Sequence, residues 1–176
     1  MSHSLDTLDV PVTTAGRALD DTDRQIVAFL QRDARMANAE IARRLGMAPS
    51  AIFDRIRKLE ERHIISGYEA RLNPKAVGLG LTAFIFVRGE DGVGDTKTGA
   101  LLAKIPEAQE VHHVAGEDCY LVKVRVADTD SLGILLRERI GAIKSVRSTR
   151  TTIALGTLKE TYRLPVGAEL EGESRR

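Results

Sequence analysis

The sequence lacks the features of a secreted, disulfide-bonded or membrane-spanning protein. Its 176 residues include a single cysteine, Cys119, which excludes an intramolecular disulfide. The longest run without a charged residue is Ala76–Val87, which has 12 residues, whereas a membrane-spanning helix needs roughly 18. The N-terminus, MSHSLDTLDV, carries acidic residues where a secretory signal carries basic ones before an apolar stretch. We therefore expect a soluble, cytoplasmic protein with no membrane partner.

Motifs of catalysis and metal binding are also missing. The sequence contains no GxSxG and no Walker motif, and Gly78–Gly80 and Gly92–Gly94 lack the strand–GxGxxG–helix context of a nucleotide fold. His112 and His113 are adjacent, so in a strand they face opposite sides and cannot ligate one metal ion. With a single cysteine in the chain, a structural zinc site is not expected. The sequence predicts no catalytic residue, no metal site and no cofactor.

The overall charge is almost balanced, but one segment is basic. The chain has 26 lysines and arginines against 25 acidic residues, a formal net charge of +1. Between Arg43 and Arg62 there are six basic and three acidic residues. A local basic face can bind a polyanion, because the phosphate field acts over a Debye length of about 8 Å at physiological salt.

Residues 17–72 have the apolar spacing of short helices. The first helix, of about 12 residues, can be capped by Asp20 or Asp21, and acidic residues suit the positive end of a helix dipole. The second covers about residues 37–45 and ends at Gly46, since glycine tolerates the left-handed conformation at helix ends.

A third helix begins at Pro49, a favoured first-turn residue, and extends to about Arg62. Its apolar residues lie at i, i+4 and i+7 and predict a buried stripe of Ile52, Ile56 and Leu59. Residues 64–72 are short and apolar with a central glycine, which predicts a small hairpin or wing.

After residue 74 the pattern changes to strands that alternate with helices. We expect strands at 81–87, 110–115, 119–126 and 145–155, and helices at 95–105 and 129–140. The order β-α-β-β-α-β is that of the ferredoxin-like fold. The predicted fold class is α+β, a winged helix-turn-helix followed by a ferredoxin-like βαββαβ domain. The expected segments are a disordered tail (1–16), the helix-turn-helix domain (17–72), a linker (73–80), the βαββαβ domain (81–163) and a flexible tail (164–176).

The turn at Gly46 between the second and third helices matches a helix-turn-helix, whose second helix enters the major groove of DNA. The polar face of the third helix would then approach bases and phosphates. In the alternative interpretation, its arginines form i,i+3 and i,i+4 ion pairs on a solvated helix face. Arg55 suits a structural ion pair as well as a DNA contact. The candidate DNA-binding residues are Arg43, Arg44, Ser50, Ala51, Asp54, Arg55, Arg57 and Lys58.

Several short motifs occur in one order along the chain. Leu19–Ile26 has the pattern Leu-Asp-x-x-Asp-x-x-Ile, and Arg55–Glu60 has Arg-hydrophobic-x-x-Leu-Glu. Leu72–Pro74 gives a Leu-Asn-Pro boundary, and Val114–Gly116 gives a Val-x-Gly loop. Over about residues 17–163 the sequence resembles the Lrp/AsnC (leucine-responsive/asparagine-type) family of bacterial transcription regulators. The resemblance implies sequence-specific binding of double-stranded DNA.

The resemblance also implies that the second domain forms dimers, often octamers, and binds an amino acid or similar small molecule. It places the ligand between the loop of the two central strands and the last strand. Loop amides, an acid and threonine hydroxyls would then hold it. Many members have Gly-x-aromatic-Asp-Tyr where this chain has Gly-Glu-Asp-Cys-Tyr, so the acid has moved one place or been replaced by cysteine. The candidate ligand residues are His113, Gly116, Glu117, Asp118, Cys119, Tyr120, Thr149, Thr151 and Thr152.

The residues themselves predict a homodimer. The strand at 81–87 places Ala83, Ile85 and Val87 on one face, and Phe84 and Phe86 on the other. A second apolar face on a small sheet backed by helices indicates a partner sheet. The closed symmetry of a dimer suits a pseudo-palindromic operator.

Two other functions fit the predicted architecture. Siroheme decarboxylases share the two-domain arrangement, and the His112–His113 pair favours an enzyme of that kind. A stand-alone small-molecule sensor without DNA binding is the second alternative. The basic third helix, which an enzyme would not need, favours a DNA-binding regulator without catalytic activity.

Overall fold

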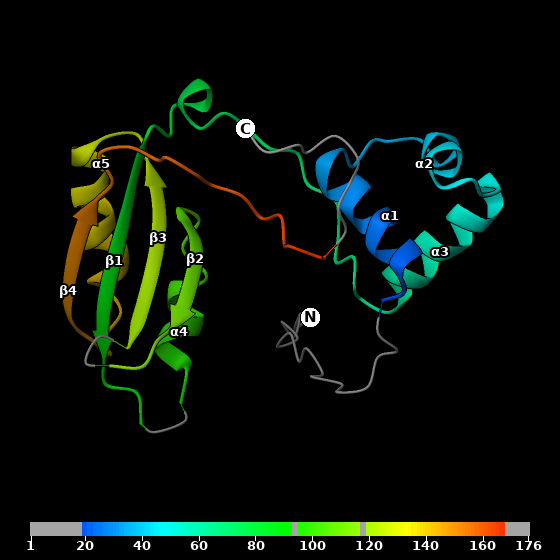
Figure 1. Cartoon of the computed structure of the whole chain (residues 1–176). Coiled ribbons are helices and arrows are strands. Elements are labelled where there is room, and N and C mark those ends of the chain that lie inside the picture. The colour runs from blue at the N-terminus through cyan, green and yellow to red at the C-terminus, as the bar shows by residue number, and fades with distance from the viewer. Residues whose placement is uncertain (1–18, 93–94, 117–118, 168–176) are drawn as a thin grey trace, which may run out of the picture. The chain divides into compact units, whose positions relative to one another are not determined.

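The computed structural model describes residues 19–92, 95–116 and 119–167 (Figure 1). The chain divides into two compact units, Met1–Glu69 with Thr161–Arg176, and Ala70–Glu160. We call them the helical unit and the sheet unit. Within the described ranges, no helix has the length and apolar character that a membrane crossing requires.

The helical unit contains α1 (Asp21–Arg32), α2 (Asn38–Leu45) and α3 (Pro49–Glu61). Asp20 is the N-cap of α1, and its Oδ1 accepts the backbone N–H of Asp23 at 2.7 Å. Gly46 ends α2 in the left-handed conformation, with φ at 63°. The three predicted helices are confirmed. Their core consists of Ile26, Val27, Ala28, Phe29, Leu30, Ile41, Ala42, Ile52, Ile56 and Leu59.

The predicted hairpin at residues 64–72 is not formed. The structure has no strand anywhere in residues 62–80. Instead, the backbone N–H groups of Ile64 and Ile65 both bond to the Leu59 carbonyl, at 2.9 and 3.2 Å, and close the end of α3. An isolated two-stranded hairpin is at best marginally stable in water, and the described residues of the helical unit contain no strand with which this segment could pair.

The sheet unit is built on β1 (Leu81–Gly89), β2 (Ala108–His113), β3 (Tyr120–Val126) and β4 (Val146–Ile153). The strands lie in the order β2-β3-β1-β4, and every neighbouring pair is antiparallel. This is the ferredoxin-like arrangement, so the predicted α+β fold is confirmed.

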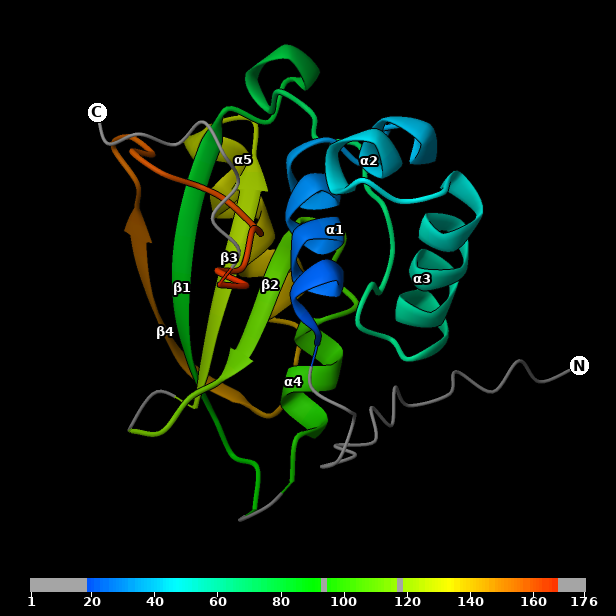
Figure 2. The ribbon, with the colours of Figure 1, turned by 45° about the vertical axis from the view of Figure 1, so that its right-hand side comes forward.

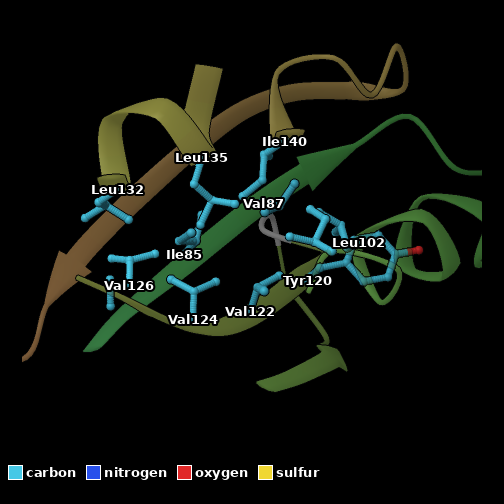
Figure 3. Close-up of a cluster of buried hydrophobic side chains, with 12 residues drawn as sticks. Ile85, Val87, Leu102, Tyr120, Val122, Val124, Val126, Leu132, Leu135 and Ile140 are labelled. Atoms are coloured by element: carbon cyan, nitrogen blue, oxygen red, sulfur yellow. The ribbon is translucent and has the colours of Figure 1, made fainter. Parts of the chain in front are cut away.

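Helices cover one face of the sheet. They are α4 (Lys97–Leu102) and α5 (Thr129–Ile134), which continues as the π-helix η2 (Leu135–Ile140), while the linker holds the 3-10 turn η1 (Lys75–Val77). Figure 3 shows the core between helices and sheet, where Ile85, Val87, Val122 and Val124 are fully buried. The alternation predicted for the central strands is confirmed on this face.

The opposite face, which we call the open face, carries Phe84, Phe86 and Leu121, all half-buried. Lys123 and Arg125 also lie on this face and are almost completely buried. Residues 154–160, which follow β4, cross this face (Figures 1 and 2), and Glu160 contacts both cations. The segment after β4 therefore covers part of this face.

The chain end returns to the helical unit. Leu164 exchanges two hydrogen bonds with the side chain of Gln31 on α1, at 2.6 and 3.1 Å. Arg24 donates to the Val166 carbonyl at 3.0 Å, and Val166 packs against the helical core. Residues 164–167 are therefore held on α1, whereas the sequence predicted a flexible tail from residue 164.

Candidate functional site

α3 presents one polar face away from its core. Its apolar stripe is buried as predicted, and Ile52 and Leu59 expose 0% and 1% of their surface. Because α2 and the turn at Gly46 precede it, α3 has the place of a recognition helix. Five exposed polar residues occupy its outer side, namely Ser50, Asp54, Arg57, Lys58 and Glu61.

Arg55 lies on the inner side of α3. Its Nη1 donates to Asp20 Oδ2 and to Asp23 Oδ1, both at 2.7 Å, and Asp23 is buried. The hydrogen bond to Asp20 and, to a smaller extent, the one to Asp23 raise the pKa of Arg55. The Asp23 backbone N–H and then Arg55 lower the pKa of Asp20. In this structure Arg55 ties α3 to the start of α1, which is the structural role weighed for it from the sequence.

The arginines of α2 share one acid. Arg43 forms two hydrogen bonds with Glu40, at 2.9 and 2.8 Å, and Arg44 forms one at 2.7 Å. Hydrogen bonds from Arg43 and then Arg44 lower the pKa of Glu40 to about 2. The Arg44 guanidinium also lies 5.3 Å from the ring centre of Phe29. Arg44 thus braces α2 on α1, while Arg43 exposes 72% of its side chain.

The sequence interpretation missed Phe53. This side chain exposes 57% of its surface on α3, four residues before Arg57 and therefore adjacent to it on the helix. Its position outside the i, i+4, i+7 stripe was the signal that could have found it. Arg57 itself is only loosely paired, at 3.7 Å from Glu61, and Ala51 is half-buried at the start of the helix.

Several predicted ligand residues meet at one end of the sheet. His113 pairs with Tyr120, Tyr120 with Val87, and Val87 with Thr149, so these four residues form a row across the strands. Residues opposite each other in a ladder point to the same face, which here is the helix-covered one. The His113 and Tyr120 rings stack with their centroids 5.1 Å apart. Thr151 lies on the same face.

Tyr120 is held by residues that the sequence interpretation missed. Its hydroxyl donates to Asp91, which also accepts from the Thr98 hydroxyl at 2.8 Å. Burial and then the bond to Asp91 raise the pKa of Tyr120 to about 12. Burial raises the pKa of Asp91, but the bonds from Tyr120 and Thr98 outweigh it and leave that pKa lowered. No sequence motif joins positions 91, 98 and 120, so only the fold brings them together.

The other predicted ligand residues are not all in this row. Thr152 pairs with Phe84 and lies on the open face, the side away from Thr149 and Thr151. Cys119 is half-buried, with its Sγ 4.0 Å from the Gly89 carbonyl. Gly116 has φ of 134°, a conformation that side chains disfavour. Glu117 and Asp118 lie outside the described residues.

The two histidines point to opposite faces, since His112 pairs with Leu121 and His113 with Tyr120. His112 contacts Glu110 at 3.2 Å. Among the residues that the structure describes, no three His, Cys, Asp or Glu side chains cluster as a metal site would require.

Two open cavities in the sheet unit share no lining residue with the predicted ligand set. One, of about 340 Å³, is lined by Glu107, Ser131, Ile134, Leu135, Glu138 and Arg139. The other, of about 610 Å³, is lined by Glu90, Asp91, Asp95, Lys97, Leu101, Ala142, Ile143, Lys144 and Ser145. The second adjoins the Tyr120 row through Asp91.

A helix-turn-helix unit with an exposed polar third helix, joined to a ferredoxin-like unit, is typical of a class of two-domain DNA-binding regulators. Residues 19–60 match the AsnC-type helix-turn-helix domain, and residues 82–164 match the Lrp/AsnC ligand binding domain. The leucine-responsive regulatory protein of Salmonella typhimurium is 35% identical over 153 residues, covering 86% of this chain and 93% of that protein. The chain belongs to the Lrp/AsnC family of transcription regulators.

Solved structures agree with this assignment. The feast or famine regulatory protein of Mycobacterium tuberculosis, complexed with L-methionine, is 41% identical with a TM-score of 0.77, covering 84% of this chain and 99% of that one. A Neisseria meningitidis transcriptional regulator, also in an L-methionine complex, is 29% identical with a TM-score of 0.79, covering 85% and 97%.

Proposed function

We propose that this chain is a cytoplasmic, non-enzymatic transcription regulator that reads operator DNA with the outer face of α3 and responds to an amino acid. The observation that carries the proposal is the exposed side of α3, where Ser50, Asp54 and Arg57 face away from the buried stripe. A helix with such a face, braced by α2, fits the major groove.

The exposed residues divide by the contacts they can make. Ser50 and Ala51 at the helix start suit phosphates and base edges, and Arg57 reaches guanine or phosphate further along. Phe53 can meet a thymine methyl group. Arg43 can turn to a phosphate at little cost, because its pairing with Glu40 is exposed to solvent. Arg55 supports α3 from behind instead of touching DNA.

The effector we propose is an amino acid bound near the Tyr120 row. Two similar structures are complexes with L-methionine, and the row contains three of the predicted ligand residues, His113, Tyr120 and Thr149. Tyr120 would supply its ring rather than its hydroxyl, since the hydroxyl is bonded to Asp91. The acid that many family members carry in this loop has moved one place or been replaced by Cys119, so we expect a different amino-acid preference from theirs.

The working unit would be a homodimer, further assembled into an octamer. Phe84, Phe86 and Leu121 on the open face are only half-buried, and Leu155 and Leu158 beside them are fully exposed. Apolar surface of this kind favours a second copy of the chain. A two-fold dimer would place two α3 helices about 10–10.5 bp apart, or a multiple of that, on a pseudo-palindromic operator.

The test is a DNA-shift assay on the chain's own upstream region over a salt series, with each of the twenty amino acids in turn. We expect specific binding that weakens with salt and changes with one amino acid. Absence of specific binding by a normally folded dimer would overturn the proposal and leave the stand-alone sensor. Haem-like absorbance in the purified protein would instead point to the tetrapyrrole enzyme.

A further inference from the structure

The segment after β4 is anchored on the sheet unit by one residue. Glu160 Oε1 lies 2.5 Å from Lys123 Nζ, and Glu160 Oε2 lies 2.7 Å from Arg125 Nη2. Both cations keep only 10% of their side chains exposed. Lys123 also pairs with Glu110, and Arg125 with the neutral amide of Gln109. Glu160 therefore supplies the negative charge that one of two buried cations would otherwise lack.

The same segment is anchored on the helical unit a few residues later. The Leu164 N–H and carbonyl bond to both ends of the Gln31 side-chain amide, in the manner of a strand pair. Arg24 donates to the Val166 carbonyl, and the Val166 side chain packs on the core of α1, α2 and α3. The side chains of Gln31, Arg24 and Val166 thus fix this segment to the helical unit.

The two anchors are separated by only three residues, 161–163. A chain spans at most about 3.6 Å per residue, so the backbone from Glu160 to Leu164 reaches at most about 14 Å. The other covalent connection between the units is the stretch from Ala70 to the start of β1 at Leu81, which is almost three times as long. The segment after β4 is therefore the tighter of two connections.

We propose that residues 160–166 are a coupling segment that transmits the state of the open face to the DNA-binding unit. Release of Glu160 from Lys123 and Arg125 would lengthen this connection from the four residues after Glu160 to the eleven that separate Ile153, the end of β4, from Leu164, and the helix-turn-helix would reorient more freely. β3 carries both cations and begins directly after the loop with the predicted ligand residues Gly116 and Cys119, so a shift of β3 would reach Glu160. This regulatory role rests on the proposed function, although the two-anchor linkage does not.

Linkage makes a prediction that independent anchors do not. When one anchor is closed, the other forms at a high effective concentration, which strengthens paired contacts by about 10²–10⁴-fold. Loss of Glu160 on the sheet unit should therefore loosen Leu164 on the helical unit. The matched control is Lys159→Gln, which changes a charge at the neighbouring exposed position.

The experiment measures amide hydrogen exchange in the full-length free protein. In Glu160→Gln we expect the Leu164 amide to exchange at least 10-fold faster than in wild type, and in Lys159→Gln at the wild-type rate. Gln31→Ala is the reciprocal variant and should speed exchange in residues 154–160 without touching the buried cations. Equal exchange in Glu160→Gln and Lys159→Gln would overturn the coupling, as would a Gln31→Ala effect confined to residues 161–167.

Measurements of operator binding by the same variants separate this proposal from the function proposed above. If wild type binds its operator and responds to an amino acid, Glu160→Gln and Gln31→Ala should each reduce the response by a similar factor, and the double variant no further. Additive losses in the double variant would contradict coupling. If wild type binds no DNA, the regulatory function fails, and the exchange result still decides whether the two anchors are linked.

Discussion

The helical unit and the sheet unit use charge in opposite ways. On α2 and α3 the ion pairs are local and exposed, as in Arg43–Glu40 and Arg57–Glu61. In the sheet unit, Lys123 and Arg125 are almost buried and meet Glu160, which lies 37 and 35 residues away. Exposed pairs contribute about 0–1 kcal/mol, whereas removing one partner of a buried pair costs about 3–5 kcal/mol.

This difference separates residues that bind from residues that hold the fold. Arg57 on the outer side of α3 can leave its weak partner Glu61 for DNA without destabilising the protein. Lys123 and Arg125 lose a shared partner when Glu160 leaves them, so in this structure they hold the chain after β4 on the open face. Arg55 is the exception within the helical unit, because its partner Asp23 is buried.

Among these predictions, the largest loss of unfolding free energy is expected for a substitution at Gly99 in the sheet unit. A Cβ there would lie 2.6 Å from Tyr120 Cε1, closer than side chains tolerate. We expect Gly99→Ala to lower the free energy of unfolding by about 3 kcal/mol, at the upper end for overpacking. Gly133→Ala in α5 is the control, since its nearest neighbour is the mobile end of Arg137 at 3.4 Å. Equal thermal stability of the two variants would contradict the packing described for Tyr120.

A smaller effect is expected at Arg55, which tests whether the helical unit also depends on a partly buried ion pair. Arg55→Ala leaves Asp23 buried without its cation, and we expect a loss of about 2 kcal/mol in the unfolding free energy. Urea unfolding followed by circular dichroism would measure it. Unchanged stability would mean that Arg55 is available for DNA after all.

Alkaline pH should weaken the sheet unit through Tyr120. The pKa of Tyr120 is raised to about 12 from an unfolded value of 10.0. The stability linked to its neutral form is therefore complete below pH 10 and lost as pH rises toward 12. The loss of unfolding free energy over this pH range is on the order of 1 kcal/mol.

Tyr120→Phe is the control, because it has no proton to lose and should show a flatter decline of stability between pH 10 and 12. An identical alkaline decline in both proteins, measured by near-ultraviolet circular dichroism, would remove Tyr120 as the cause.

The smallest effect on stability is expected for a substitution of Glu40. Its pKa is lowered to about 2 by Arg43 and Arg44, so the carboxylate stays charged until pH falls well below 4.5. Because the group is exposed, we expect Glu40→Gln to leave the melting temperature unchanged. NMR titration of the Glu40 carboxyl carbon should give a midpoint near 2, and Arg43→Ala should raise it. A midpoint near 4.5 in wild type would show that the pair does not form.

The spacing of neighbouring residues was enough to predict the helices, the order of helices and strands along the chain, and the polar face of α3. The stripe of Ile52, Ile56 and Leu59 and the left-handed Gly46 follow from spacing of a few residues. Contacts between distant residues were not predictable in the same way. Nothing in the sequence joins Asp91 to Tyr120 or Glu160 to Lys123, because only the packed sheet brings them together.

The hairpin and the tail were both predicted wrongly because neighbouring residues do not show which partners a segment has. Residues 64–72 have strand-like composition, but strands need partners that a single segment does not supply. Residues 164–167 looked like a tail because their partners, Gln31 and Arg24, lie more than a hundred positions earlier.

The most direct test of the central claim compares Arg57→Ala with Arg55→Ala, two residues apart on α3, by operator binding and by unfolding. We predict that Arg57→Ala keeps wild-type stability, loses about 1–3 kcal/mol of operator affinity and relaxes preference at one base pair. Arg55→Ala should lose stability and keep its sequence preference. Unchanged affinity and specificity in Arg57→Ala would contradict the assignment of α3 as the DNA-reading helix through this face.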